Sequence, residues 1–505
     1  MGGCLNKGCV NKTSKPILAE KSHRNDQSPI LSGGSDKDST DACPTGLNVI
    51  HPIIVPERET RILNCRKSDV PSKESVHHLT VQFPFVVDQK CINFIKQSKT
   101  MFIMRGVPGS GKSTIVRDLV KKYPDAVVCS ADHYMHSEND NEYKFDANNL
   151  REVHEKCQQK AQSSCEIYCP VIVIDNTNIR RWEMKKYLEL ARSYNYIVIM
   201  VVPRTDWKMD PNECARRNVH DVPAEIIQRK INDFEDAVPI YYAWFLNENS
   251  SAHLLSLKRK YLLECVSNVP ELKEIICQNF SHEDSLEEKL EEIYPTVRPD
   301  STRISTCAHH VLHCTAKFLG SRRNCMPGVE AYCQSEILQK AVGNVWPLMI
   351  IGLSITPTTI GARVHLNDEV MWHLFDSQEE KDFDNNFQTQ NLSINIDKEN
   401  PVPSRNADQV FNKQFSWPAY FENVSQNYPR KGRTAHITLG FKHQPKDTVQ
   451  DILHVCHKEY ILTKEHREIE AFEVDGGRIH HYGDGVCALY LHKPFEVDAL
   501  FTGFY

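Results

Sequence analysis

A phosphate-binding loop constrains the fold of this chain more than any other feature of its sequence. Residues 106–113 match the pattern G-x-x-x-x-G-K-[ST]. The apolar stretch 101–104 precedes this loop, and a helical pattern at 115–123 follows it, which is the strand, loop and helix context that the motif requires. The glycines allow backbone N–H groups to surround phosphates at a helix N-terminus. The sequence therefore predicts an α/β domain that binds a nucleotide.

The residues of this loop have separate expected roles. We expect Lys112 to reach the outer phosphates of ATP or GTP and Ser113 to ligate Mg²⁺. The rest of the expected nucleotide-binding set is Gly106, Gly109, Ser110, Gly111 and Thr114. A glycine-rich turn without a ligand is the alternative interpretation, and nucleotide binding alone does not establish turnover.

Three further apolar strands are predicted at 126–129, 171–174 and 196–201, with helical segments between them. This alternation is typical of a parallel sheet covered by helices on both faces. Asp132 follows the first of these strands, where it can accept the proton of an attacking hydroxyl, and Asp175 follows the next, near the expected metal. The alternative role of either aspartate is an N-cap in a βα loop.

Arg216 and Arg217 lie on a helical segment after the last of these strands. They are placed to close over the phosphates like a lid, and a solvated basic helix face is the alternative. Together with the loop and the two aspartates, this segment resembles the P-loop kinase module of the polynucleotide kinase family. The resemblance implies that Asp132 is the base that activates a 5′-hydroxyl.

A second site is predicted from two histidine triplets in the C-terminal half. His313 and Thr315 alternate with apolar residues in one strand pattern, and His436 and Thr438 do so in another. Each pair therefore projects from one face of its strand. Only three of the 23 histidines begin a His-x-Thr or His-x-Ser triplet, and the third, His78, lies at the edge of a polar N-terminal stretch. A coincidental pair of core or surface histidines is the alternative.

Two imidazoles that face each other across a cleft suit in-line displacement at phosphorus. Their pKa lies near neutral pH, so one ring can activate water while the other protonates the leaving oxygen. We expect His436 to activate water and His313 to protonate the 3′-oxygen, and the reverse assignment stays open. The hydroxyls of Thr315 and Thr438 are expected to donate to the oxygens on which charge accumulates. This reaction requires no metal or other cofactor.

The paired triplets resemble the two-histidine phosphoesterase superfamily, and the order of motifs resembles the 2′,3′-cyclic-nucleotide 3′-phosphodiesterase family. This resemblance covers about residues 80–505, except for one insertion. Besides the loop and the triplets, its motifs are residues 82–85, 243–246, 313–318, 361–364 and 501–505. The resemblance implies hydrolysis of 2′,3′-cyclic phosphates of nucleotides or RNA ends to 2′-phosphates, with Phe318 as a platform under the base.

Arg433 is a candidate substrate-binding residue at an unusual position. The family places an arginine two residues before the second histidine, where this chain has Thr434. A shift by one residue turns a side chain to the other face of a strand unless a β-bulge compensates. Contact between Arg433 and the phosphate therefore depends on the local backbone.

Composition and periodicity divide the 505 residues into four segments. We expect a disordered region at 1–78, a P-loop kinase-like domain at 79–254, a helical linker at 255–298 and a two-histidine phosphodiesterase domain at 299–505. A polar stretch at about 376–430 is predicted to be a disordered surface insertion. The predicted fold class is α/β, with a parallel N-terminal sheet and an α+β C-terminal domain.

The first residues predict attachment to a membrane surface. Removal of Met1 exposes Gly2, the acceptor for N-myristoylation, and Cys4 is placed for palmitoylation. One myristoyl chain binds membranes only marginally, so a second signal is required. No apolar run approaches the roughly 18 residues that span a bilayer. An ordinary disordered start with nearby cysteines is the alternative.

Charge and cysteine content limit the partners and the compartment. A net charge of -6 gives no global attraction to nucleic acid, so any RNA-binding site must be local. The 18 cysteines include no C-x-x-C pair, which indicates reduced thiols and a cytoplasmic protein. Three interpretations follow: a cyclic phosphodiesterase with an ATP- or GTP-binding module, a bifunctional RNA-healing enzyme with 5′-OH kinase activity, or a lipid-anchored adaptor between membrane and cytoskeleton.

Overall fold

The computed structural model describes most of the two predicted domains. The described residues are 83–135, 149–277, 285–295, 311–321, 324–325, 328–378, 380–382, 432–442, 448–465 and 467–505. The predicted disordered region 1–78, with Gly2 and Cys4, and most of the predicted insertion 376–430 lie outside them. Among the described helices, none is long and apolar enough to cross a bilayer.

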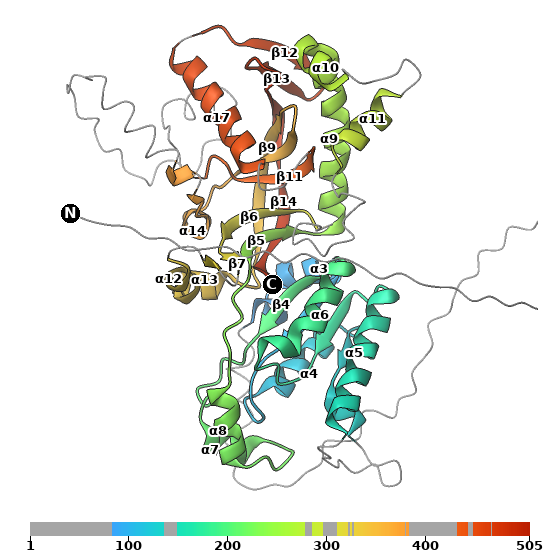
Figure 1. The fold of residues 1–505 in the computed structure, drawn as a ribbon, viewed down its shortest axis with the longest axis vertical. Coiled ribbons are helices and arrows are strands. Elements are labelled where there is room, and N and C mark those ends of the chain that lie inside the picture. Colours follow the sequence, from blue (N-terminus) through green and yellow to red (C-terminus); the bar gives the residue numbers. More distant parts are fainter. Residues whose placement is uncertain are drawn as a thin grey trace, which may run out of the picture. The chain divides into compact units, whose positions relative to one another are not determined.

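The first region contains a four-stranded parallel sheet with the strand order β2-β3-β1-β4. Its strands are β1 (Thr100–Met104), β2 (Val127–Cys129), β3 (Val171–Ile174) and β4 (Ile197–Val201). Its helices are α2 (Pro84–Val87), α3 (Gln89–Lys96), α4 (Lys112–Lys122), the 3-10 turn η2 (Ala131–Tyr134), α5 (Leu150–Glu166), α6 (Arg181–Ser193), α7 (Pro211–Arg217) and α8 (Ala224–Asn232). This sheet confirms the predicted parallel α/β fold (Figure 1).

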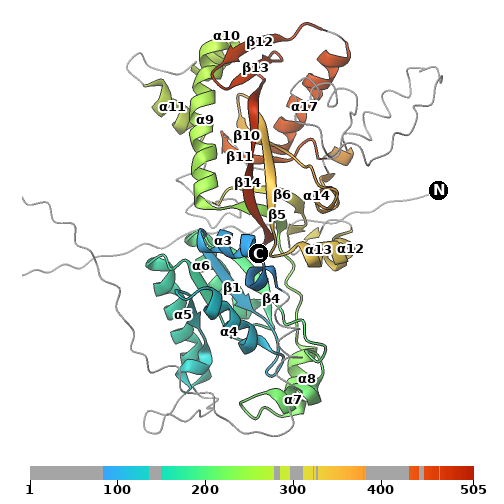
Figure 2. The same ribbon diagram turned by 180° about the vertical axis from the view of Figure 1, so that it is seen from behind.

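Alternating residues of β1 bury both faces of this sheet. Phe102 and Met104 pack with residues of α2, α3 and α4 in one apolar cluster. Met101 and Ile103 pack with residues of α5 and α6 in another. A strand that is apolar at every position is the pattern expected when helices cover both faces. Figure 2 shows these helices around the sheet from the other side.

The second region is built on an eight-stranded sheet with the order β12-β13-β14-β5-β6-β11-β10-β9. Its strands are β5 (Tyr241–Leu246), β6 (His313–Phe318), β9 (Val345–Ile355), β10 (Thr359–His365), β11 (His436–Phe441), β12 (Glu470–Val474), β13 (Gly477–His481) and β14 (Cys487–Phe504). A separate short pair joins β7 (Gly320–Ser321) and β8 (Asn324–Cys325). Because the long strand β14 also pairs with β9, six strands form a closed circuit of pairings.

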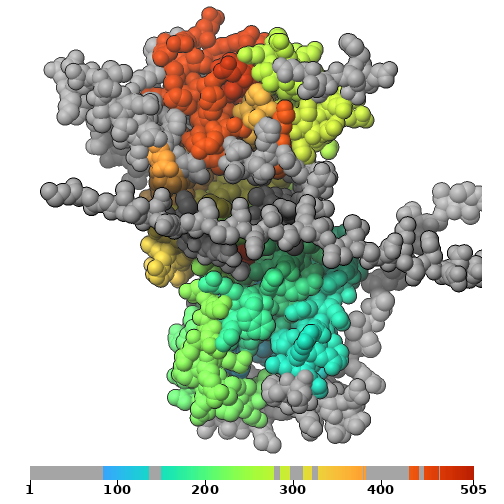
Figure 3. All heavy atoms as spheres, in the orientation of Figure 1, coloured from blue at the N-terminus to red at the C-terminus, as the bar shows by residue number. Residues whose placement is uncertain are grey.

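Helices cover this second sheet. They are α9 (Glu248–Asn268), α10 (Pro270–Cys277), α11 (Leu286–Ile293), α12 (Val329–Gln334), α13 (Glu336–Ala341), α14 (Glu369–Leu374) and α17 (Thr448–Lys464). In both ribbon views α9 and α17 flank the strands from opposite sides. Figure 3 shows the same arrangement as a surface, with α17 in orange-red and α9 to α11 in yellow-green. This antiparallel sheet with its helices confirms the predicted α+β domain.

The structure corrects the predicted boundary at residue 254. Strand β5 lies inside the predicted range 79–254, yet it pairs with β14 and β6 in the second sheet. All six of its residues are buried, because a strand with partners on both sides and covered faces needs apolar residues at every position. The described helices of the predicted linker 255–298 also belong to this region, since α9 contributes Tyr261 and Leu262 to its core.

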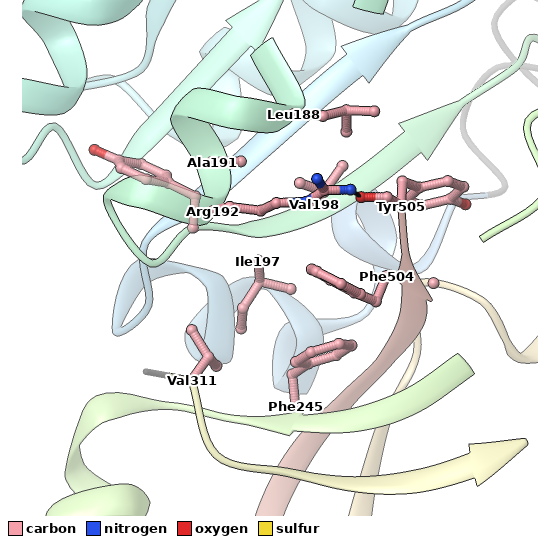
Figure 4. A pocket seen from close by; sticks show the side chains of 11 residues that line it. Leu188, Ala191, Arg192, Ile197, Val198, Phe245, Val311, Phe504 and Tyr505 are labelled. Atoms are coloured by element: carbon pink, nitrogen blue, oxygen red, sulfur yellow. Dashed lines mark hydrogen bonds between the residues drawn. The ribbon is translucent and has the colours of Figure 1, made fainter. Parts of the chain in front are cut away.

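Packing between the two sheets centres on the end of β14. The hydroxyl of Thr502 donates to the carbonyl oxygen of Val198 on β4 at 2.9 Å. The guanidinium of Arg192 on α6 lies over the ring of Phe504 at 5.1 Å and donates to the carbonyl oxygen of Tyr505. Arg192, Phe504 and Tyr505 also line a small apolar pocket (Figure 4). The last strand therefore belongs to one sheet and supports the other.

Candidate active sites

Strands β6 and β11 bring the two histidine triplets together. They pair antiparallel through the buried central residue of each triplet. Side chains alternate along a strand, so the flanking residues project from the opposite face. Continuing this antiparallel register places His313 opposite Thr438 and His436 opposite Thr315. The four predicted catalytic side chains therefore share one face of two neighbouring strands.

Both imidazole rings are oriented by a backbone carbonyl two residues earlier. Nδ1 of His313 lies 3.0 Å from the carbonyl oxygen of Val311, and Nδ1 of His436 lies 2.6 Å from that of Thr434. A carbonyl oxygen can only accept, so Nδ1 carries the proton in each neutral ring. The Nε2 atoms are then the ones that can accept a further proton.

Burial makes both histidines weakly basic. Desolvation lowers the pKa of His313 to about 4; the bond to Val311 partly opposes this shift, and a charge on His436 adds to it. Desolvation also lowers the pKa of His436. The ring of His313 stacks on Tyr241 at 5.1 Å and contacts Phe245 at 5.3 Å, so aromatic carbon accounts for much of its lost hydration. Both rings are therefore neutral at neutral pH until an anion favours protonation of one.

Thr315, Thr438 and Phe318, which are also predicted for this site, lie on the same two strands. Thr315 is exposed and Thr438 is half-buried. Phe318 ends the strand that carries His313, and 53% of its surface is exposed. An exposed aromatic ring is a surface on which a nucleobase can stack. Hydroxyl donors, imidazoles and an aromatic platform are thus available along β6 and β11.

The phosphate-binding loop lies between β1 and α4, as the sequence predicts. Gly111 has φ +105° and Gly109 has φ +78°, a backbone region that favours glycine. Lys112 is buried at the start of α4, and its Nζ donates to the carbonyl oxygen of Val107 at 2.9 Å. Within the described residues, Oγ of Ser110 is buried and has no hydrogen-bond partner. This polar, backbone-lined loop suits the phosphates of a nucleotide.

The two predicted aspartates lie around Lys112. Burial lowers the pKa of Lys112, and the charges of Asp175 and Asp132 oppose the shift. Burial raises the pKa of Asp175 to about 6, although Lys112 opposes this. Burial also acts to raise the pKa of Asp132, but the hydrogen bond and charge of His220, 3.4 Å away, lower it on balance. The structure therefore groups one cation, two carboxylates and a histidine.

The predicted lid helix α7 packs on the phosphate-binding loop. A Cβ at Gly109 would lie 2.0 Å from the carbonyl oxygen of Cys214 on α7. Arg217 lies over the ring of Trp207 at 3.9 Å, and Nε1 of Trp207 donates to the carbonyl oxygen of Gly109 at 3.3 Å. Glu213 accepts hydrogen bonds from both predicted lid residues, Arg216 and Arg217.

Comparison with known proteins agrees with this architecture. A family model described as 2′,3′-cyclic nucleotide 3′-phosphodiesterase matches residues 238–393 and 407–505, about half of the chain. The chain belongs to this phosphodiesterase family. A second model, described as an AAA domain, matches residues 101–238 and so covers the phosphate-binding loop.

Two relatives are similar in sequence to most of the chain. The 2′,3′-cyclic-nucleotide 3′-phosphodiesterases of Pongo abelii and Mus musculus are each 29% identical to it, over 84% of this chain and 87% of their own length. NEDD4-binding protein 2 of Homo sapiens is 36% identical over 162 residues, which are 31% of this chain and 9% of that protein. Similarity to these phosphodiesterases thus extends over most of the chain.

The surroundings of Arg433 differ from those expected of a residue that binds a substrate phosphate. Its side chain is 7% exposed, and its Nη1 lies 4.0 Å from Oε2 of Glu380. Thr434 donates its N–H and its hydroxyl to the same carboxylate. The turn before β11 therefore directs Arg433 toward a buried carboxylate.

Several residues that contact His313 or the turn before β11 were not predicted from the sequence. Tyr241 and Phe245 lie in a strand that we assigned to the first domain, although the motif 243–246 marked that segment as part of the family resemblance. Glu380 lies in a polar stretch with no apolar periodicity, and it is nevertheless 4% exposed. Its carboxylate contacts residues more than 50 positions away, which no local pattern reveals.

Proposed function

We propose that this chain hydrolyses 2′,3′-cyclic phosphates of nucleotides or RNA ends to 2′-phosphates. The paired histidines carry this proposal, because both rings are held at Nδ1 by a backbone carbonyl and lie beside hydroxyls on adjacent strands. Membership of the phosphodiesterase family supports the substrate class. The relatives that share 84% of the chain are named for 2′,3′-cyclic nucleotides.

The reaction uses the two Nε2 atoms in turn. Nε2 of His436 takes a proton from water, whose oxygen attacks phosphorus in line with the 3′-oxygen. The bond between phosphorus and the 3′-oxygen breaks, and protonated His313 gives its Nε2 proton to that oxygen. The hydroxyls of Thr315 and Thr438 donate to the non-bridging oxygens as charge accumulates. Phe318 supports the base of the substrate.

Replacement of either histidine tests this function. His313→Ala and His436→Ala should each lower the hydrolysis of 2′,3′-cyclic AMP by at least about 10²-fold, because each removes one proton-transfer group. The measurement is the steady-state rate, with Asp132→Asn as a control in the other site. Near-normal hydrolysis by either histidine variant would reject the assignment.

A second candidate activity belongs to the P-loop region, and the cluster of Asp132, Lys112, Asp175 and His220 favours it. We propose that this region binds ATP or GTP with Mg²⁺, with Ser113 holding the metal and Asp132 accepting the proton of a 5′-hydroxyl. The glycine backbone and the buried, unbonded Oγ of Ser110 support a phosphate ligand. Bound Mg²⁺ would neutralise charge on the phosphates.

Phosphate transfer tests this candidate. Incubation with γ-labelled ATP, Mg²⁺ and a 5′-OH oligonucleotide should label the oligonucleotide, and Asp132→Asn should abolish the labelling. Absence of transfer by the unaltered chain would leave nucleotide binding as the remaining role of this region.

Membrane attachment through myristoylated Gly2 and palmitoylated Cys4 is a separate proposal, supported by the sequence Met1-Gly2-Gly3-Cys4. Metabolic labelling with fatty-acid analogues should modify the chain, and Gly2→Ala should release it from membranes. An adaptor role toward the cytoskeleton would require catalytically inactive variants to keep this localisation.

A further inference from the structure

A buried carboxylate holds the turn that precedes the second catalytic histidine. Oε2 of Glu380 accepts a hydrogen bond from the N–H of Gly432 at 3.0 Å, and Oε1 accepts one from the N–H of Thr434 at 2.7 Å. The hydroxyl of Thr434 donates to the same Oε1. Because Glu380 is 4% exposed, water does not replace these bonds easily. One carboxylate therefore fixes three donors of the turn 432–434.

The same turn orients the imidazole of His436. The carbonyl oxygen of Thr434 accepts the Nδ1 proton of His436 at 2.6 Å. Since Glu380 holds both the N–H and the hydroxyl of Thr434, it fixes the residue whose carbonyl fixes the ring. A hydrogen-bonded path therefore runs from Glu380 through Thr434 to His436.

Neighbouring groups support the turn from its other side. Sγ of Cys456 on α17 donates to the carbonyl oxygen of Arg433 at 3.5 Å. Nη2 of Arg363 lies 3.9 Å from this sulfur and donates to Oε2 of Glu459 at 3.1 Å. The turn thus lies between Glu380 and α17, so its position depends on both.

The segment that carries Glu380 also contacts the strand of the first catalytic histidine. The N–H of Asp376 donates to the carbonyl oxygen of Ala316 on β6 at 2.9 Å, and its carboxylate pairs with Lys317. Residues 376–382 begin the predicted surface insertion, and the structure corrects that expectation for Glu380, whose side chain is buried. This segment reaches from β6 to the turn before β11.

We propose that Glu380 is a positioning residue for the phosphodiesterase reaction and acts on His436 through Thr434. The inference rests on the proposed phosphodiesterase function. Loss of the carboxylate leaves the buried N–H and hydroxyl of Thr434 without their acceptor, which is costly enough to make the turn rearrange. The carbonyl then moves away from Nδ1, and the Nε2 atom of His436 is no longer held toward the substrate.

The variant Glu380→Gln in the full chain tests this role. An amide keeps one acceptor oxygen, but its NH₂ group faces a backbone donor where the carboxylate accepted a bond. We expect kcat for 2′,3′-cyclic AMP to fall between about 10-fold and 10²-fold, because misplacement of a reacting group costs this much. KM should stay within about twofold, since Glu380 does not touch the substrate.

Nuclear magnetic resonance of the histidine nitrogens separates positioning from general destabilisation. In Glu380→Gln the Nδ1 signal of His436 should shift and its titration should change. The signal of His313 serves as an internal control, because its partner Val311 packs against an apolar cluster instead. A shift of both histidines together would overturn the proposal in favour of a general loss of structure.

Two further variants complete the test. Thr434→Val removes only the hydroxyl bond, so it should show a smaller loss of kcat, and it remains informative if Glu380→Gln does not fold. Glu291→Gln is the matched control, since Glu291 pairs with the buried Lys258 elsewhere in the region, and it should leave kcat unchanged. Unaltered kcat and His436 signals in folded Glu380→Gln would refute the positioning role. An inactive unaltered chain would instead reject the proposed function.

Discussion

At the scale of single residues, the two histidines that we propose to be catalytic have neutral hydrogen-bond partners. Each Nδ1 proton goes to a backbone carbonyl, of Val311 or Thr434. A carboxylate in that place would stabilise the imidazolium and raise its pKa. With a neutral acceptor, desolvation dominates and the pKa of both rings falls. We therefore expect a nearby anionic phosphate to make protonation of either ring more favourable.

The pH dependence of catalysis follows from these shifts. The acid must be protonated, and its protonated form is lost as pH rises through a pKa that burial has lowered, to about 4 for His313. The alkaline limb of kcat/KM, which reports the free enzyme, should therefore lie below the ordinary histidine value of about 6.5. Rate measurements from acid to alkaline pH check this. An alkaline limb above pH 7 would contradict it.

At the scale of elements, local patterns predicted what depends on local sequence. The strand at 171–174 and the glycine loop follow from apolar runs and from backbone freedom, and the structure contains both. The sheet to which β5 belongs could not be predicted in this way, because a strand that is apolar on both faces fits either sheet. The orientation of Arg433 also depends on a distant residue, Glu380. Contacts between residues far apart in the chain determine these two features, so they could not be predicted from local sequence patterns.

The contact between α7 and the phosphate-binding loop gives a prediction at this scale. Gly109→Ala places a Cβ 2.0 Å from the carbonyl oxygen of Cys214, at φ +78°. We expect it to displace α7 and to weaken binding of ATP with Mg²⁺ at least about tenfold, while phosphodiesterase kcat is unchanged. The measurement is the ligand-induced shift in melting temperature.

A matched variant controls for the backbone conformation alone. Gly328 has a similar φ of +75°, but a Cβ there meets nothing within 4 Å. Gly328→Ala should therefore cost only about 1 kcal/mol of stability and leave nucleotide binding intact. If both variants bind ATP alike, the packing of α7 on the loop is not what shapes the site.

At the scale of the whole described molecule, the two sheets share a core. Tyr241, Phe245, Leu500 and Phe504 of the second sheet pack in one cluster with residues of the first, such as Ile197. Burial of apolar surface in a common cluster couples the stability of the parts that contribute to it. We therefore expect the two regions to unfold together.

Truncation of Phe504 tests this coupling. Phe504 is 8% exposed, so Phe504→Ala should cost about 3 to 5 kcal/mol. Calorimetry and fluorescence should show one transition at a lower temperature. Trp182→Ala, at a residue that is 69% exposed, is the control and should shift the transition little. A variant with one region unaffected would show that the regions unfold independently.

The closed circuit of strand pairings has a consequence for how the catalytic strands can move. Each of β14, β5, β6, β11, β10 and β9 pairs with another described strand on both sides. The junction between β6 and β11 is formed by a single residue pair, whereas β5 and β14 share six. The pairing between the two histidine-bearing strands is therefore the least extensive in the circuit, and any separation of β6 from β11 would be resisted by the other five pairings.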